Sequence, residues 1–332
     1  MALSTFNSKS WLSSWIVFVL VTAFSLFFYE RELRDEGFLP SVDLHEDLWS
    51  WHRMRAGGSG DDKLVLLGAS RLLLDTSMAE LKERYPASSI HMLGLNGKYP
   101  LSTLQSLAND EDFTGTVVVS LNAQALEPFY WDMQQDYVDH YEHQFSFYLS
   151  LDAWLKSIYQ SSLVFADSSL AWPKLVAYYD KNKRFKDPGY TTRALDLSIR
   201  GDFERVDAES LSKHFYNEKL KDYQDNPPTK LEEWLPQIEK VNELTRKIID
   251  RGGDVVLLRL PTSKGHWELD DEYYPKETYW DRLVQRSYAP AVHFLDIEGL
   301  SDFDLPDTSH LDFRDRDRFT STLFDGLPIE LK

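Results

Sequence analysis

From Lys63 onward, short continuous apolar runs alternate with longer stretches in which apolar residues recur at helical spacing. Continuous apolar runs are typical of parallel strands that are buried on both faces. They predict five strands, at residues 64–67, 90–93, 116–121, 254–260 and 292–297. The stretches between and after them predict helices at 75–86, 100–109, 230–250 and 313–323, with Asp75 or Thr76 capping the first. This alternation predicts an α/β fold, a three-layer α/β/α domain around a parallel five-stranded sheet.

One stretch of the chain does not follow this alternation of strands and helices. Residues 123–228, between the third strand and the next helix, are too many for a plain crossover and are rich in aromatic residues. We predict that they form a helical cap, inserted beside the functional site. The aromatic rings either build the core of this cap or line a groove for a sugar or an acyl group.

The amino-terminal segment 11–29 is apolar apart from four small hydroxyl residues. Its length is close to the roughly 20 residues that cross a bilayer as a helix, and aromatic residues stand at both ends. We predict an uncleaved transmembrane helix; a cleaved signal peptide and a buried helix of a soluble protein are the alternatives. The glycine-rich stretch 56–62 marks a boundary. The predicted organisation is a tail and anchor (1–29), a juxtamembrane linker (30–62) and a large domain (63–332).

The charges around the apolar segment leave its orientation open. Lys9 precedes it and Arg31 and Arg34 follow it, so the positive-inside rule gives no clear answer. A short tail without acidic residues, followed by a large acidic domain, favours a cytoplasmic amino terminus. The large domain would then lie in the periplasm or outside the cell.

The composition of the chain disfavours some kinds of binding partner and some kinds of site. The 332 residues are 42% hydrophobic, which is enough for a substantial core. The net charge of −18 disfavours nucleic acid or an anionic membrane surface as the main partner, because both would repel an acidic protein. With no cysteine, the chain has no disulfide, no thiolate metal site and no cysteine nucleophile.

The candidate chemistry begins at Ser70, which follows the first predicted strand after Gly68 and Ala69. The carboxyl ends of strands in open α/β sheets are where ligands bind. A serine nucleophile needs a base and a group that orients the base. Asp307 and His310, three residues apart, suit these roles.

Each of these residues has a simpler alternative. Ser70 could cap a helix, Asp307 could be only a cap, and His310 could be a surface histidine. His266 and His293 are rival bases, although His293 lies inside an apolar strand and His266 has no carboxylate in a comparable position. Arg71 could contact substrate or form a salt bridge.

Four stretches, GASR, LGLNGKYP, VVVSLNAQ and DTSH, resemble in order and spacing the four sequence blocks of the SGNH (GDSL-like) hydrolase superfamily. Ala69 and Ser120 depart from the commonest form, but neither departure removes a catalytic group. The resemblance implies a Ser70–His310–Asp307 triad. It also implies an oxyanion hole built from the N–H groups of Ser70 and Gly97 and the amide of Asn122. Within LGLNGK, Gly94 could be the donor in place of Gly97, or Asn96 could contribute.

The resemblance implies a membrane-anchored serine esterase or O-acyltransferase that acts on acyl esters, chiefly acetyl esters, of a cell-envelope polysaccharide. In layout the chain is similar to the teichoic-acid D-alanylation and alginate O-acetylation proteins, in which a polytopic membrane acyltransferase supplies the acyl group. The alternatives are a simple ester hydrolase and a non-catalytic glycan-binding assembly protein.

We expect no cofactor and no metal. Phosphate-binding loops are absent from the sequence. His140 and His143 have the spacing of a helical metal pair, but their acidic, tyrosine-rich surroundings favour a solvated face.

Overall fold

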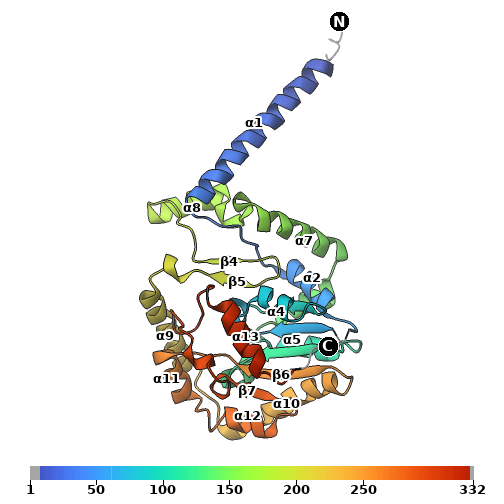
Figure 1. Ribbon diagram of the computed structural model, residues 1–332, viewed down its shortest axis with the longest axis vertical. Coiled ribbons are helices and arrows are strands. Elements are labelled where there is room, and N and C mark those ends of the chain that lie inside the picture. Colours follow the sequence, from blue (N-terminus) through green and yellow to red (C-terminus); the bar gives the residue numbers. More distant parts are fainter. Residues whose placement is uncertain (1–7, 61, 330–332) are drawn as a thin grey trace. The chain divides into compact units, whose positions relative to one another are not determined.

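The computed structural model describes residues 8–60 and 62–329 (Figure 1). The first seven residues, which belong to the predicted tail, and Asp61 of the predicted linker lie outside the described residues. So do residues 330–332.

A parallel sheet of five strands forms the centre of the large domain. Its strands are β1 (Lys63–Leu67), β2 (Ser89–Met92), β3 (Thr116–Ser120), β6 (Asp254–Arg259) and β7 (Ala291–His293). They lie in the order β2-β1-β3-β6-β7, and all four pairings are parallel. This is a doubly wound order. Successive strands are added first toward one edge of the sheet and then toward the other, so the strand order reverses between β1 and β3. The predicted α/β fold with a five-stranded parallel sheet is confirmed.

Helices cover both faces of this sheet. On one face, side chains such as Val65, Leu67 and Val117 pack in one core with α5 (Leu101–Asn109) and α10 (Leu231–Ile249). Residues of α2 (Glu46–Ala56), α11 (Lys264–Tyr273) and α12 (Trp280–Arg286) complete that core. On the other side, α13 (Arg316–Gly326) packs against α3 (Ser70–Asp75) and α4 (Met78–Arg84). The central strands are buried on both faces, which explains why their sequences are continuously apolar.

Three local expectations were wrong. The helix expected at 75–86 is α4, which runs only from Met78 to Arg84, while Asp75 is the last residue of α3; the cap of α4 is neither Asp75 nor Thr76. Ser77 caps α4, because its Oγ accepts a hydrogen bond from the Glu80 N–H at 3.2 Å. The last strand ends at His293 and passes into a 3₁₀ turn, and the terminal helix begins at Arg316 rather than Phe313.

The insertion is helical only in part. It contains α6 (Gln135–Asp139), α7 (Phe147–Ser162), α8 (Trp172–Asn182) and α9 (Ala208–Asp225), but also an antiparallel pair of strands, β4 (Thr191–Arg193) and β5 (Ile199–Gly201). Each strand has three residues and β4 carries only polar ones, so neither has the apolar run that identifies a strand. The stretch with His140 continues α6, and His140 contacts Asp47 at 2.9 Å.

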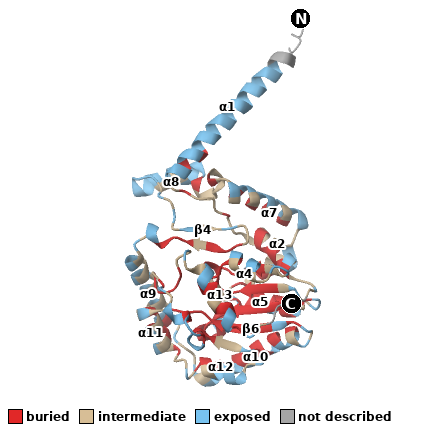
Figure 2. Cartoon of the chain, viewed as in Figure 1, coloured by how far each residue is buried: buried red, intermediate tan, exposed pale blue. Residues whose placement is uncertain are grey.

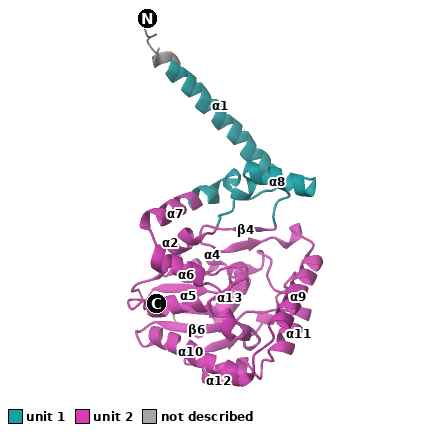
Figure 3. Ribbon diagram, turned by 180° about the vertical axis from the view of Figure 1, so that it is seen from behind, with its two compact units in different colours: residues 1–43, 158–189 teal, residues 44–157, 190–332 magenta. Residues whose placement is uncertain are grey.

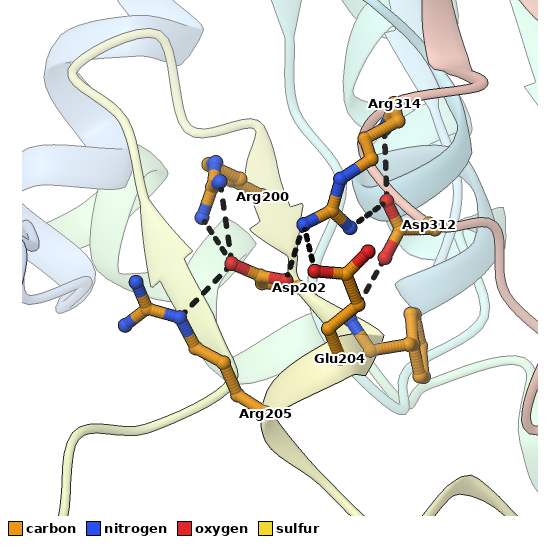
Figure 4. A network of polar contacts seen from close by, with 7 residues as sticks. Arg200, Asp202, Glu204, Arg205, Asp312 and Arg314 are labelled. Atoms are coloured by element: carbon orange, nitrogen blue, oxygen red, sulfur yellow. Dashed lines mark hydrogen bonds and ion pairs between the residues drawn. The ribbon is translucent and has the colours of Figure 1, made fainter. Parts of the chain in front are cut away.

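Figure 4 shows the polar contacts that join β5 and the residues after it to Asp312 and Arg314, which follow His310 in the chain. Asp202 accepts hydrogen bonds from Arg200, Arg205 and Arg314, and Arg314 also bonds Asp312 and Glu204. The Asp312 carboxylate accepts the backbone N–H of Phe203 at 2.9 Å. Burial would raise the pKa of Asp202, but the arginines outweigh it and hold the pKa below its usual range.

The chain divides into two compact units, one of residues 1–43 and 158–189 and one of residues 44–157 and 190–332 (Figure 3). This division differs from the predicted domains at two places. Residues 44–62 belong with the sheet because α2 is buried there: Trp49 donates to the Leu93 carbonyl, and Arg53 bonds Ser106. Residues 158–189 of the insertion belong with the amino-terminal helix.

The smaller unit contains α1 (Ser8–Asp35). Of the described residues, one helical stretch, Trp11–Asp35, is long and apolar enough to cross a membrane. None of its apolar window is buried by the protein, as Figure 2 shows.

Candidate active site

The structure brings Ser70, His310 and Asp307 together in a continuous chain of hydrogen bonds. Ser70 is the first residue of α3 and follows β1 directly, while Asp307 and His310 lie in the loop before α13. His310 Nε2 lies 2.8 Å from Ser70 Oγ, and His310 Nδ1 lies 2.8 Å from Asp307 Oδ2. These contacts have the geometry in which a histidine takes a proton from serine while a carboxylate orients the ring.

Asp307 is completely buried. Its Oδ1 accepts the backbone N–H groups of Ser309 and His310, at 2.9 and 2.7 Å. Burial alone would raise the pKa of Asp307, but the hydrogen bonds from His310 and these N–H groups outweigh it and lower the pKa. The carboxylate is therefore ionised at neutral pH and able to stabilise an imidazolium.

Thr308 gives the loop its shape. Its φ is +71°, in the left-handed region that non-glycine residues rarely adopt. This turn lets the side chain of Asp307 reach back to both the backbone and the ring of His310. Strained backbone of this kind is found at functional sites because the surrounding structure holds it in place.

Asp75 is a second buried carboxyl beside this loop, and sequence reasoning assigned it only a capping role. Its Oδ1 accepts the N–H of Leu311 at 2.9 Å, immediately after His310. Its other oxygen has no partner among the described residues. Burial raises the pKa of Asp75 to about 7. We assign it a positioning role, since it fixes the backbone next to His310.

The residues of the three expected oxyanion donors, Ser70, Gly97 and Asn122, border one cavity. Gly97 has φ +70° and open space around its Cβ position, so its backbone can be approached closely. Asn122 follows β3, and its Oδ1 accepts the Ala125 N–H at 3.1 Å. This bond leaves the NH₂ group of Asn122 as the part of the amide that can donate.

The two alternatives within LGLNGK differ. Gly94 is buried against Leu73 and the Gly68 carbonyl and does not border the cavity, whereas Asn96 does.

The cavity has a volume of about 600 Å³. Its walls come from the ends of β1, β3 and β6, from the β4–β5 strands and from α9. The insertion thus contributes to the site, through Tyr130, Tyr190 and Phe215 among others. The Phe215 ring packs edge-on against His310 at a centroid distance of 5.9 Å. Phe215 was missed in the sequence, because nothing in its helix distinguishes it from other aromatic residues of the insertion.

Charged groups of both signs border this cavity. Arg259 forms an ion pair with Asp270 at 2.5 Å. Arg71 is held by uncharged partners: its Nε donates to Ser309 Oγ at 3.1 Å, and its Nη2 lies 3.3 Å from His266 Nε2. Arg71 therefore ties α3 to the loop of the triad, and no carboxylate of the described residues pairs with it.

Neither rival histidine contacts Ser70. His266 is buried beside Arg71, and burial followed by the charge of Arg71 lowers its pKa to about 3. His293 accepts the Leu295 N–H through Nδ1 at 3.1 Å, and burial lowers its pKa to about 3 as well. Both histidines are uncharged at neutral pH. In the part of the chain that the structure describes, no three His, Asp or Glu residues are grouped to hold a metal ion.

No family model and no curated protein matches this sequence. Among solved structures, the chain is similar to the crystal structure of TesA, with 10% sequence identity and a TM-score of 0.34. The match covers 80% of this chain and 98% of that one. So low a TM-score says nothing about the chemistry of the site, which rests on the side chains.

The titration of Asp75 gives a testable pH dependence. Its pKa is about 7 in the folded protein, against an ordinary value of 3.8, so the folded state holds the extra proton between these values. The contribution of Asp75 to the free energy of unfolding should then fall as pH rises through this window, by at most about 4 kcal/mol at 1.36 kcal/mol per pKa unit. Asp75→Asn keeps an oxygen that can accept the Leu311 N–H, and it cannot ionise. Its free energy of unfolding relative to that of wild type should therefore be higher at about pH 8 than at about pH 5.

Urea unfolding of the purified full chain at the two pH values measures this gain. Asp302→Asn, at an exposed carboxyl, is the matched control and should change stability by less than about 0.5 kcal/mol at either pH. If the Asp75→Asn and wild-type curves run parallel with pH, Asp75 does not titrate in this window.

Proposed function

We propose that this protein is a serine-dependent esterase or O-acyltransferase, anchored to a membrane by α1. The observation that carries the proposal is the hydrogen-bond chain from buried Asp307 through His310 to Ser70, at the edge of a cavity of about 600 Å³. A buried, ionised carboxylate behind a histidine is what acyl transfer through serine requires. The ordered sequence blocks that resemble the SGNH superfamily support the same chemistry.

In the proposed reaction, Ser70 Oγ attacks the carbonyl carbon of an ester while His310 Nε2 takes its proton. Asp307 stabilises the resulting imidazolium. The tetrahedral oxyanion is stabilised by the N–H groups of Ser70 and Gly97 and the NH₂ group of Asn122. His310 then gives its proton to the leaving alkoxide, which leaves an acyl group on Ser70.

The second half of the reaction decides between hydrolysis and transfer. His310 takes a proton from water or from a hydroxyl of an acceptor, and that oxygen attacks the acyl carbonyl of Ser70. We favour a sugar hydroxyl of a cell-envelope polysaccharide, with a polytopic membrane acyltransferase as the acyl source. The tyrosines and charged groups that border the cavity suit a polyhydroxylated acceptor. The large domain would then lie in the periplasm or outside the cell.

Ser70→Ala tests the enzyme class directly. It should lower hydrolysis of 4-nitrophenyl acetate by the full chain by at least about 10³-fold, because the nucleophile is lost. Ser301→Ala, at an exposed serine away from the cavity, is the matched control and should retain wild-type activity. Activity of Ser70→Ala equal to that of wild type would exclude the proposed mechanism.

The same assay with and without an oligosaccharide acceptor separates transfer from hydrolysis. O-acylated sugar detected by mass spectrometry favours the acyltransferase. Turnover with water alone, whatever the acceptor, favours the simple hydrolase. Glycan binding that survives Ser70→Ala, with no acyl-enzyme in the wild type, would favour the non-catalytic alternative.

Asn122→Ala tests the oxyanion assignment. Removing one oxyanion donor costs about 10²- to 10³-fold in kcat, and we expect KM to change little because the donor acts in the transition state. Asn217→Ala on the exposed side of α9 serves as control. A loss confined to KM would indicate that Asn122 binds substrate and does not stabilise the oxyanion.

A further inference from the structure

The helix α8 and the residues that follow it expose large apolar side chains. Trp172 is 76% exposed, Val176 42%, Tyr179 45% and Phe185 83%. Trp172, Val176 and Tyr179 recur at i, i+4 and i+7, so they share one face of α8. The Phe185 ring lies against Tyr179 at a centroid distance of 5.3 Å. A cluster of this kind is costly to leave in water, which indicates a partner. We call residues 172–187 the α8 segment.

The charge of this segment is opposite to that of the protein. It has five basic residues and two acidic ones, a net charge of +3 in a chain whose net charge is −18. Lys181 makes no polar contact with the described residues, while Lys183 and Arg184 form ion pairs with the exposed Asp180 and Asp187. Exposed aromatic rings next to basic residues are typical of helices that lie on anionic membrane surfaces.

The packing within the smaller unit places this segment at the end of the apolar helix. Leu33 and Phe38 form a small core with Val164 and Leu170, and Leu175 of α8 packs against it. Leu33 is four residues beyond Tyr29, the last residue of the apolar segment. At 1.5 Å per residue this places Leu33 about 6 Å further along the helix axis. The interfacial layer of a bilayer has a similar depth.

Hydrogen bonds fix this arrangement. Glu30 is 9% exposed, and its carboxylate accepts the N–H groups of Val164 and Phe165, each at 3.0 Å. Arg34 bonds Glu30 and also the Ser162 carbonyl. The start of residues 158–189 is thereby held to the turn where α1 leaves its apolar segment. Figures 1 and 3 show α8 lying crosswise to α1 at that end. A helix crosswise to one that spans a bilayer lies along the plane of that bilayer.

We propose that the α8 segment is an interfacial membrane anchor, which inserts Trp172, Val176, Tyr179 and Phe185 among the headgroups of anionic phospholipids beside α1. The occupant of this surface is the bilayer that α1 spans, so the inference rests on the membrane anchoring proposed above. The aromatic rings enter the boundary between headgroups and acyl chains, and the basic residues bind lipid phosphates. The predicted result is a second attachment of the smaller unit to the membrane, beside α1.

The absence of cysteine allows a direct test in the full chain. Phe18→Cys, in the exposed apolar part of α1, and Val176→Cys, on α8, are each labelled with a nitrobenzoxadiazole probe. The labelled protein is placed in nanodiscs of phosphatidylcholine, with or without phosphatidylglycerol, and in a lipid-free amphiphilic polymer. Quenching by iodide then reports how far each probe is exposed to water.

We expect the probe at position 18 to be protected in both nanodiscs. The probe at position 176 should be protected several-fold more with phosphatidylglycerol than with phosphatidylcholine alone. The triple variant Lys181→Gln, Lys183→Gln, Arg184→Gln should lose that difference, because these side chains face solvent and carry the charge. Circular dichroism of the variant checks that it remains folded.

The other outcomes overturn distinct claims. If the probe at position 18 is quenched as in water, the membrane anchor itself is wrong, and this inference falls with it. If that probe is protected but the one at position 176 is quenched equally in all three media, the α8 segment does not meet the bilayer. Protection of position 176 in the lipid-free polymer would show that protein covers it, either a second copy or another part of the chain. Equal protection in both nanodiscs would exclude recognition of anionic lipid.

Discussion

The carboxylate of Asp307 is fully buried, and the hydrogen bonds that it accepts are what make its burial possible. The N–H groups of Ser309 and His310 bond one oxygen, and the ring of His310 bonds the other. An unpaired buried carboxylate would be protonated or would destabilise the fold by several kcal/mol. These hydrogen bonds compensate the buried charge and also orient the imidazole of His310. The contacts that stabilise the loop are therefore the ones that position the base.

The sheet determines where this loop must lie. Ser70 follows β1 and Asn122 follows β3, the two neighbouring parallel strands between which the strand order of the sheet reverses. At such a point the loops that leave adjacent strands diverge to opposite faces, which opens a crevice at the carboxyl edge. The loop before α13 closes the crevice from the other side, with Arg71 bonded to Ser309 and Asp75 bonded to the Leu311 N–H. These two contacts join the serine side of the site to the histidine side.

Much of the fold was predictable because burial on both faces leaves a simple signature. Leu64 to Leu67 and Thr116 to Ser120 form apolar or β-branched runs, and strands appear at both places. The β4–β5 strands left no such signature, because three-residue strands of mostly polar residues are held by tertiary contacts such as the arginine cluster around Asp202. The burial of α2 was also missed. Its mixed charge suggests a surface helix, yet Arg53 is buried by its bonds to Ser106.

The candidate site divides in the same way. Ser70 was singled out by its place at a strand end, and Asp307 and His310 by their spacing. Gly97 and Asn122 were singled out only by the resemblance to the SGNH superfamily. The residues that support them were not predictable. Asp75 has the spacing of a helix cap, and its actual partner, Leu311, is more than two hundred residues away. Phe215 borders the cavity only because the insertion folds back over it.

The central claim is that Ser70 is an activated nucleophile. Intact mass spectrometry of the purified full chain after treatment with a fluorophosphonate tests it most directly, because this reagent phosphonylates a serine whose proton a base can accept. The account predicts one adduct on the wild type and none on Ser70→Ala or His310→Ala. An unlabelled wild type, or an adduct of equal yield on either variant, would contradict it.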